Sequence, residues 1–228
     1  MKRKLIGAFL IALLLGLLPV QSWAVDWSTT KGFNFRAALA YVTDGSNEQM
    51  VNNNGGDGVY PTTDTIGGDS VTYGWDVTTV TRDRSSSVDR RLAGLHYYGT
   101  GSANATFRID LPATGDYKIR LAIGDASNAQ TDHWVDVQDN GSTLFNIGGG
   151  TVDTASGHFL DANGNDYASA DWPGSNTQRT ITMTSTVLLI VNRSVSGVGY
   201  GELAHVEVEQ VLSASPTVRT LNLLGVGR

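Results

Sequence analysis

The sequence predicts an all-β protein, an antiparallel two-sheet jelly-roll sandwich. Short segments in which apolar and polar residues alternate recur along the chain, separated by stretches rich in Gly, Asn, Asp and Ser. Strict alternation is the pattern of a strand with one buried face, because successive side chains of a strand point to opposite sides. Beyond residue 24, no segment keeps the apolar period of a helix. Strands alone are therefore expected to build the core.

The first 24 residues have the pattern of a secretory signal peptide. Lys2 to Lys4 supply positive charge ahead of an apolar run from Leu5 to Val20, and Ser22 and Ala24 are small residues just before the expected cleavage point. The apolar run is shorter than the roughly 18 to 20 residues that span a bilayer, which favours cleavage over a membrane anchor. The mature protein is expected to be secreted or periplasmic, with no membrane contact.

The mature chain is acidic and lacks cysteine. Three of the 16 basic residues leave with the signal peptide, so 13 remain against 22 acidic residues, a net charge of −9 with histidine neutral. This charge repels phosphate backbones and argues against a nucleic-acid partner. The absence of cysteine excludes thiol nucleophiles and cysteine-bound zinc. We expect one sandwich domain over residues 25–212 and a C-terminal tail at 213–228.

The N-terminal third is expected to hold few strands. Gly32 to Arg36 begins the first strand after a loose lead-in from Val25 to Thr30. The segment from Asp44 to Ser70 is rich in Gly, Asn, Asp and Thr and has no sustained apolar period, so a long surface loop is expected there. An aromatic strand around Tyr73 to Trp75 follows.

A β-hairpin is expected at the centre of the chain. Asn104 to Leu111 and Asp116 to Ile123 both alternate, and the turn from Pro112 to Gly115 separates them. The predicted buried face consists of Phe107, Ile109, Leu111, Tyr117, Ile119, Leu121 and Ile123.

A second hairpin and three closing strands are expected after it. Asp132 to Gln138 and Thr143 to Ile147 alternate around a turn at Asp139 to Ser142. Gly148 to Ser175 is again rich in Gly, Asp, Asn and Ser and is expected to be irregular. The closing strands are predicted at Arg179 to Thr184, Thr186 to Asn192 and Glu202 to Val211.

Several short motifs carry a resemblance to a known family: Tyr73-Gly74-Trp75, Arg82-Asp83-Arg84, Phe107 to Pro112, Gly115, Tyr117 and Gly124-Asp125-Ala126. Together they resemble the galactose-binding-like (malectin-like) carbohydrate-binding β-sandwich domains that are attached to bacterial polysaccharide-degrading enzymes. The resemblance covers roughly Lys31 to Val211. It departs from the family at Arg36, where a glycine usually follows a similar Phe-Asn-Phe. The resemblance implies a jelly-roll fold and a carbohydrate ligand.

Catalysis finds little support in the sequence. Gly68 to Val71 superficially resembles the nucleophile block of a lipase-like esterase, whose serine needs a histidine base in an Asp-x-x-His block. None of the four histidines has an aspartate three residues before it, and no Gly-x-Ser-x-Gly elbow occurs. A carboxylate pair for glycoside cleavage stays open, because 22 acidic residues always offer some pair. No catalytic residue is predicted.

Binding of a glycan finds more support. Sugar sites combine an aromatic platform with a few charged or amide groups that fix orientation. The candidate ligand-binding residues are Trp75, Arg82, Arg84, Tyr97, Trp134 and Trp172.

For some of these candidates a purely structural role explains the residue as well. Trp75 shares a strand face with Tyr73 and is better explained as core than as a ligand platform. Arg82 and Arg84 can hold sugar hydroxyls, or they can pair with neighbouring acidic residues and pin a loop. Trp134 is expected on the polar side of its strand, which favours exposure.

The predicted function is a secreted, non-catalytic carbohydrate-binding module that recognises a glycan. One alternative is a secreted structural or adhesive surface protein that binds protein partners. Another is a stand-alone accessory subunit of a polysaccharide-degrading enzyme. An exposed apolar patch would favour the adhesive protein, whereas an aromatic-lined polar cleft would favour glycan binding.

A structural calcium ion is the cofactor considered. Asp161, Asn163 and Asn165 place oxygen-bearing side chains at alternate positions of a tight loop, as in the first half of an EF-hand. Asp166 replaces the glycine of that motif and Trp172 its closing glutamate, so an ion would need ligands from elsewhere. An Asx-rich turn explains the same residues. The family resemblance implies calcium, because such sandwiches often carry a structural ion.

Overall fold

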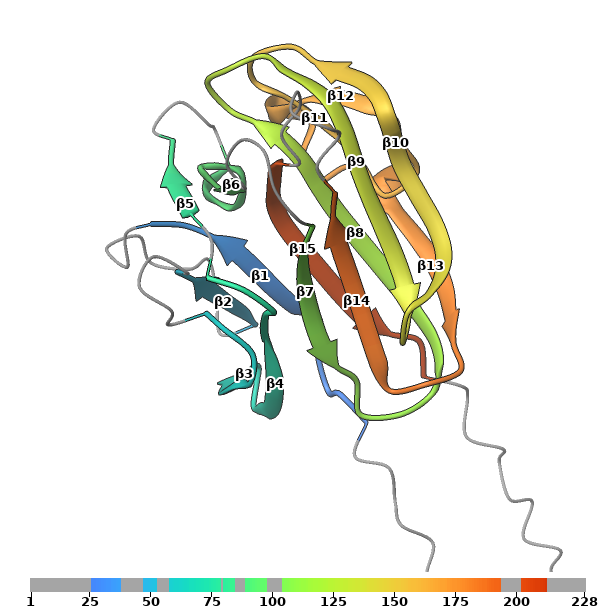
Figure 1. The fold of residues 1–228 in the computed structure, drawn as a ribbon. Coiled ribbons are helices and arrows are strands. Elements are labelled where there is room, and N and C mark those ends of the chain that lie inside the picture. The colour runs from blue at the N-terminus through green and yellow to red at the C-terminus, as the bar shows by residue number, and fades with distance from the viewer. Residues whose placement is uncertain are drawn as a thin grey trace, which may run out of the picture.

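The computed structural model describes residues 26–37, 47–52, 58–78, 80–84, 89–97, 104–193 and 202–212 and confirms the predicted two-sheet sandwich (Figure 1). The predicted signal peptide and the C-terminal tail lie outside the described residues. No helix in the described part of the chain is long and apolar enough to cross a membrane.

Within the described residues, sheet A has nine strands and sheet B has six, and nearly all strand pairs are antiparallel. Sheet A contains β1 (Lys31–Phe35), β2 (Glu48–Val51), β5 (Val80–Asp83), β6 (Gly94–Tyr97), β8 (Gly115–Asp125), β11 (His158–Leu160), β12 (Asp166–Ala168), β13 (Gln178–Met183) and β15 (Glu202–Gln210). Sheet B contains, in spatial order, β10 (Ser142–Thr154), β9 (Gln130–Asp139), β14 (Val187–Asn192), β7 (Ala105–Asp110), β4 (Asp69–Trp75) and β3 (Thr62–Ile66). Three short 3-10 turns complete the described elements: η1 (Arg90–Leu92), η2 (Ser169–Asp171) and η3 (Ser175–Thr177).

The main core lies between the two sheets. Phe33 and Phe35 of β1 pack against Phe107 of β7, with ring centroids 5.3 and 4.9 Å apart. Tyr73 and Trp75 of β4 join the same cluster. All five rings are almost fully buried, and burying each such side chain stabilises the fold by about 1.5 to 3 kcal/mol. Aromatic contacts between the sheets therefore fix how they face each other.

The central hairpin was predicted with the correct buried faces and the wrong pairing. The seven residues of the predicted buried face are all in the core. However, β7 belongs to sheet B and pairs with β14 and β4, whereas β8 belongs to sheet A and pairs with β15, β13 and β11. The two strands face each other across the core, because an alternating pattern specifies which face is buried and not which strand lies alongside.

The second predicted hairpin is confirmed. β9 and β10 pair antiparallel around Asn140 and Gly141, which have φ values of 46° and 94°. Positive φ at both positions is what an Asn-Gly turn provides at the tip of a hairpin.

The predicted loop from Asp44 to Ser70 is partly wrong, since β2, β3 and the start of β4 lie within it. These strands are mostly polar, and Val51 and Ile66 are the residues that they bury fully. A polar edge strand leaves no apolar period for the sequence to reveal. The predicted irregular segment from Gly148 to Ser175 likewise contains the end of β10 together with β11 and β12.

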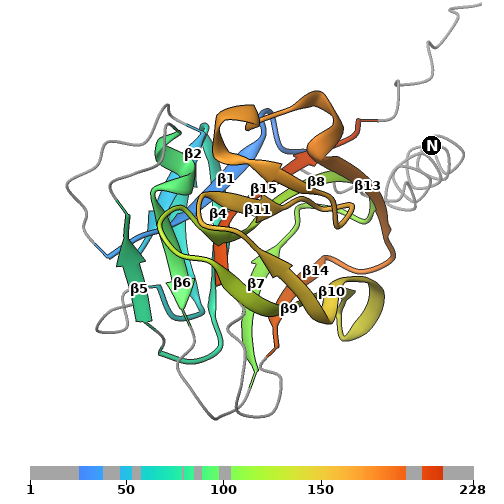
Figure 2. The same ribbon diagram turned by 90° about the horizontal axis from the view of Figure 1, so that it is seen from above.

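A smaller apolar cluster covers the outer side of sheet A. It joins Ala122 of β8 and Ala204 of β15 to Leu92, Phe159 and Trp172 from the segments laid over them. Figure 2 shows the orange covering segment beside β8 and β15, on the side away from β7 and β14.

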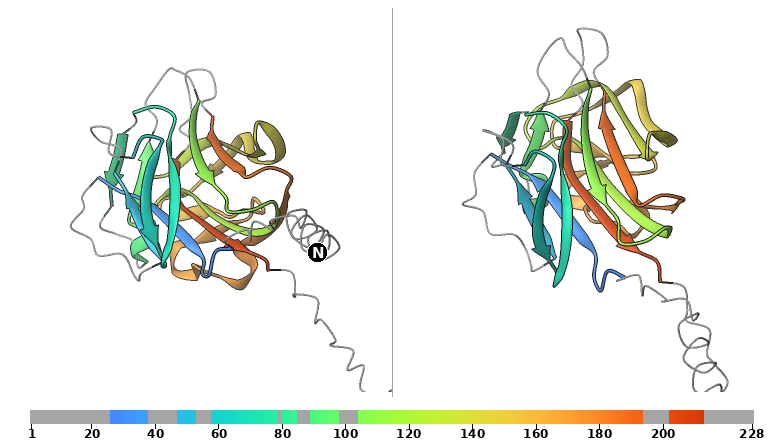
Figure 3. Two further views of the ribbon diagram at one scale, coloured as in Figure 1. Left: turned by 90° about the horizontal axis from the view of Figure 1, so that it is seen from below. Right: turned by 60° about the horizontal axis from the view of Figure 1, so that its bottom comes forward.

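The N-terminal segment lies against the β3–β4 pair. In both views of Figure 3 the teal β3 and β4 strands lie beside the blue β1. Lys31 at the start of β1 contacts Asp69 at the start of β4, with Nζ 2.7 Å from Oδ2. This contact positions one wall of a cleft that is described below.

Candidate functional site

Two of the predicted ligand-binding tryptophans are buried. Trp75 has no exposed surface and stacks on His96 with centroids 3.5 Å apart, so it is a core residue. Trp172 is 6% exposed and stacks on Tyr167 with centroids 5.4 Å apart. Little of either ring is presented to solvent.

The predicted arginines and tyrosine lie around β5 and β6. Arg84 binds the buried Asp125 through Nε at 2.8 Å and Nη2 at 2.6 Å, which matches the ion-pair explanation. Arg82 is exposed on β5, and Tyr97 ends β6 opposite Val80 in register. Three of the predicted ligand-binding residues, Arg82, Arg84 and Tyr97, thus lie on or next to the paired strands β5 and β6. The guanidinium of Arg84 is already bound to Asp125.

Trp134 lies on the outer face of sheet B, as the alternation predicted. Its neighbours Val135 and Val137 face inward and are fully buried. The indole Nε1 donates to Asp136 Oδ1 at 2.9 Å, and the Arg193 guanidinium lies 5.5 Å from the ring centroid. Trp134 and Trp172 are on opposite sheets, so the predicted residues do not form one site.

The Asp161 loop is the predicted calcium site. Asp161 Oδ1 accepts hydrogen bonds from the backbone N–H groups of Asn163 and Asn165 at 2.7 and 2.9 Å, and Oδ2 accepts from the Asn165 side-chain amide at 3.3 Å. The Asn163 amide donates to the carbonyl oxygens of Asn176 and Gln178. Both carboxylate oxygens of Asp161 are thus engaged by the loop itself, an arrangement typical of an Asx turn. This geometry favours the turn, and calcium at this loop stays a prediction.

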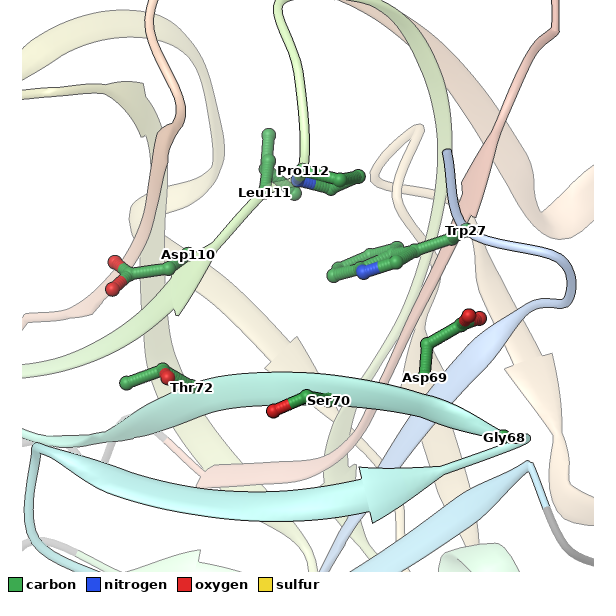
Figure 4. A pocket seen from close by; sticks show the side chains of 8 residues that line it. All are labelled: Trp27, Gly68, Asp69, Ser70, Thr72, Asp110, Leu111 and Pro112. Carbon is green, nitrogen blue, oxygen red and sulfur yellow. The ribbon is translucent and has the colours of Figure 1, made fainter. Parts of the chain in front are cut away.

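A cleft of about 520 Å³ lies among the described residues, at a place that the sequence did not indicate. Trp27, Leu111 and Pro112 form the apolar part of its lining, and Trp27 and Leu111 are each 5% exposed. Four polar side chains complete its lining: Asp69, Ser70, Thr72 and Asp110. Figure 4 shows the indole of Trp27 between the Pro112 ring and the strand that carries Ser70 and Thr72.

Asp69 is the most firmly held polar group of the cleft. Its Oδ2 atom accepts hydrogen bonds from Lys31 Nζ at 2.7 Å, from the Ser28 backbone N–H at 2.9 Å and from the Ser28 hydroxyl at 3.0 Å. The hydrogen bond from Lys31 holds the pKa of Asp69 below its ordinary value, so the carboxylate is ionised at neutral pH. Within the described residues no group donates to Oδ1, which leaves a fixed acceptor for a ligand hydroxyl.

Asp110 closes the far side of the cleft. Arg108 Nε donates to Oδ1 at 2.7 Å and the Tyr60 hydroxyl donates to Oδ2 at 3.0 Å. The guanidinium of Arg108 lies 4.3 Å from the centre of the Tyr60 ring. These contacts fix the carboxylate, which points away from Trp27 in Figure 4.

The cleft has the chemistry of a small polar ligand site. An aromatic ring with a prolyl ring beside it suits the C–H faces of a ligand, and a carboxylate with two hydroxyls suits its polar rim. The residues that line this cleft were not among the predicted ligand-binding residues. They come from three distant parts of the chain, and Trp27 lies in the segment expected to be a loose lead-in. A lone tryptophan in such a segment gives the sequence no signal of its own.

Comparison with known proteins gives no family. No protein-family model and no curated protein sequence matches the chain. Among solved structures, the protein YXIM from Bacillus subtilis is 19% identical over 80% of this chain, with a TM-score of 0.43. Bacteroides uniformis beta-glucuronidase 2 is 12% identical over 81% of this chain, with a TM-score of 0.42. The chain spans 40% of the first of these proteins and 18% of the second. A family 35 carbohydrate binding module from Clostridium thermocellum is 11% identical, with a TM-score of 0.33, and the match covers 67% of this chain and all of that module.

Proposed function

We propose that this chain is an exported, non-catalytic glycan-binding module and that the cleft between Trp27 and Asp69 binds one sugar residue. The observation that carries the proposal is a carboxylate held in one orientation in a cleft that the mostly buried Trp27 indole also lines. A pyranose ring offers apolar C–H groups on its faces and hydroxyls at its rim, and this cleft offers a partner for each.

The fixed carboxylate makes the cleft selective for a hydroxyl donor. Lys31 and Ser28 both bind Oδ2 of Asp69 and so orient its free Oδ1 before any ligand arrives. A preorganised acceptor loses less conformational entropy on binding than a mobile one. The exposed hydroxyl of Ser70 and the partly exposed hydroxyl of Thr72 add groups that both donate and accept.

The same geometry favours binding over glycoside cleavage. Hydrolysis by a carboxylate pair needs one carboxylic acid with a raised pKa to protonate the leaving group. Asp69 has a lowered pKa, and Asp110 already accepts one hydrogen bond on each of its oxygens. The hydroxyl–imidazole contact of Thr154 with His133 is buried, so a substrate would not reach it.

The proposal is tested by a glycan array on the mature protein, followed by titration of the best ligand into variants. Ser70→Arg fills the cleft from an exposed position and is expected to abolish binding without altering the melting temperature. Trp27→Ala is expected to weaken binding at least about tenfold, which corresponds to about 1.4 kcal/mol. Because Trp27 also packs against Tyr117, its melting temperature is measured in parallel.

Trp134→Ala is the matched control, since it removes a tryptophan whose ring lies on the outer face of sheet B, outside the cleft. Binding that survives Ser70→Arg and disappears in Trp134→Ala would move the site to the residue that the sequence predicted. Turnover of a glycan by the pure protein would refute the non-catalytic half of the proposal.

A further inference from the structure

A second hollow, of about 290 Å³, lies on the outer side of sheet A. Gly32 of β1 and Glu48 of β2 line one part of it. Thr30 and Asn47 lie at its rim, and Arg91 of η1, Arg120 of β8 and Glu207 of β15 complete the lining. We call it the sheet A groove. Two guanidinium groups and two carboxylates thus face one small space.

Both arginines are held by bonds that leave part of each guanidinium available. Arg120 donates to Glu207 Oε1 from Nη1 at 2.5 Å and to the Thr177 hydroxyl from Nε at 2.9 Å. Its Nη2 has no hydrogen-bond partner within the described part of the chain. Arg91 donates to Asp89 from Nε at 3.0 Å and from Nη2 at 2.6 Å, while its Nη1 is 3.9 Å from Glu48 Oε1, too far for a hydrogen bond. The groove therefore presents two fixed N–H donors.

Buried polar atoms without partners lie next to this groove. Within the described residues, the Tyr167 hydroxyl, Trp172 Nε1 and His205 Nε2 are inaccessible to solvent and make no hydrogen bond. Their rings touch, because Trp172 stacks on Tyr167 and packs edge-on against His205 with centroids 5.7 Å apart. Arg120 of the groove wall lies 5.6 Å from the Trp172 centroid.

Three such atoms on neighbouring rings need an explanation. An unsatisfied buried polar atom costs about 1 to 3 kcal/mol, and folded proteins leave few of them unless water or a ligand supplies the missing partner. His205 Nε2 is 3.8 Å from Glu207 Oε2, so this cluster borders the carboxylate that lines the groove. The cluster therefore lies behind the part of the groove wall that Arg120 and Glu207 form.

The charges around the groove indicate the class of ligand. Arg91 and Arg120 are each neutralised by an acidic partner, and Glu48 adds a further negative charge. Burial alone would raise the pKa of Glu207, but His205 and Arg120 bring it down to about 2, so it is ionised at neutral pH. An anionic ligand meets Glu48 and Glu207, and a cationic ligand meets the two arginines. Neighbouring hydroxyls of an uncharged ligand can bind both kinds of group at once.

From these observations we infer that the sheet A groove is a second binding site, separate from the Trp27 cleft, and that its ligand is a neutral sugar residue. The ligand class in this inference rests on the proposed glycan-binding function. The groove and the Trp27 cleft have no lining residue in common. Two sites on one chain would raise the apparent affinity for a polysaccharide by making the second contact intramolecular.

Calorimetric titration with neutral tetrasaccharides of glucose, xylose and galactose, and with tetragalacturonate as the charged comparison, tests this inference. Wild-type protein is expected to bind two equivalents of one neutral tetrasaccharide. Thr30→Arg fills the groove from its rim and Ser70→Arg fills the Trp27 cleft, and each is expected to leave one equivalent. The double variant is expected to bind none.

Tyr167→Phe provides a control for the buried cluster beside the groove. It removes a hydroxyl that has no hydrogen-bond partner in the described part of the chain, so the melting temperature is expected to stay the same or rise. This hydroxyl is inaccessible to solvent and does not line the groove, so the affinity for the tetrasaccharide in the Ser70→Arg background is expected to stay unchanged.

The outcomes separate this inference from the proposed function. If the wild-type protein binds one equivalent, and Ser70→Arg abolishes this binding while Thr30→Arg leaves it intact, the second site is refuted and the Trp27 cleft is supported. The reverse result supports the groove and refutes the cleft. Absence of binding to every glycan refutes both, and tighter binding of tetragalacturonate in the Ser70→Arg background refutes the neutral ligand class.

Discussion

Replacement of Glu202 by glutamine should make the protein more stable at alkaline pH. Glu202 is the first residue of β15 and is fully buried. Neither of its carboxylate oxygens has a hydrogen-bond partner in the described part of the chain. The nearby Arg84 is bound to Asp125 through Nε and Nη2, so it neutralises that carboxylate first. Burial, reinforced by the negative charge of Asp125, raises the pKa of Glu202 to about 8.

The raised pKa determines the sign and the size of the effect. In the unfolded chain Glu202 ionises near its ordinary value of 4.5, whereas in the folded protein it keeps its proton until about pH 8. The folded state therefore loses stability as pH rises through this interval, and the loss is absent below pH 4.5. At about 1.4 kcal/mol per pKa unit the difference amounts to about 5 kcal/mol. Local relaxation and water entry reduce the cost of a buried charge, and we expect about 3 to 5 kcal/mol.

Denaturant unfolding of the mature protein at pH 5, 7 and 9 measures this effect. Wild type and Glu202→Gln should have similar free energies of unfolding at pH 5, and the variant should be more stable by about 3 to 5 kcal/mol at pH 9. The difference between the two proteins isolates Glu202, because carboxylates with lowered pKa, such as Asp89, contribute equally to both. Glu209→Gln is the control, since Glu209 is partly exposed beside Lys118 and should change stability by less than about 1 kcal/mol.

Parallel stability curves from pH 5 to pH 9 would refute this reasoning. They would show that Glu202 ionises in the folded protein as readily as in the unfolded chain. A variant that is less stable than wild type at all three pH values would instead show that the carboxyl proton makes a bond that the amide does not replace.

Two further predictions concern the backbone and the Asp161 loop. Gly74→Ala should destabilise the protein by about 3 kcal/mol or more, because a Cβ atom there would lie 2.4 Å from the Tyr60 backbone nitrogen. Gly141→Ala should cost only about 1 kcal/mol, because its φ is 94° but nothing lies within 4 Å of the added atom. Equal losses of unfolding free energy for the two variants in urea would contradict the steric argument. Calcium followed by chelator should leave the melting temperature unchanged, because Asp161 already accepts three hydrogen bonds, whereas a midpoint that rises by several degrees with calcium would establish an ion site.

The sequence predicted which residues are buried better than which strands are neighbours. Phe107 and Ile119 were assigned to buried faces correctly, because period-two alternation records contact with the core. Pairing depends on where each strand enters the sandwich, and the turn after Leu111 carries the chain from sheet B to sheet A. Local residues do not encode that crossing. The polar strands β2 and β3 were not predicted, because they bury almost no side chains and therefore show no alternation of apolar and polar residues.

The candidate site was less predictable than the core. Trp134 was placed correctly, because its exposure follows from the alternation of its own strand. Trp172 was placed in a polar loop by its neighbours, yet tertiary packing buries it against Tyr167 and Ala204. The walls of the Trp27 cleft come from segments more than 30 residues apart, and no local pattern joins them.

The ion pair between Lys31 and Asp69 links the fold to the proposed function. Lys31 is fully buried, and removing an ammonium group from water costs several kcal/mol that its partner only partly offsets. A well-packed apolar residue at that position would support the sandwich equally well. What the lysine adds is orientation, since its Nζ binds both the Thr29 hydroxyl and Asp69 Oδ2. The buried charge is therefore better explained by the fixed carboxylate it holds in the cleft than by stability, which is what a binding site requires of its supporting residues.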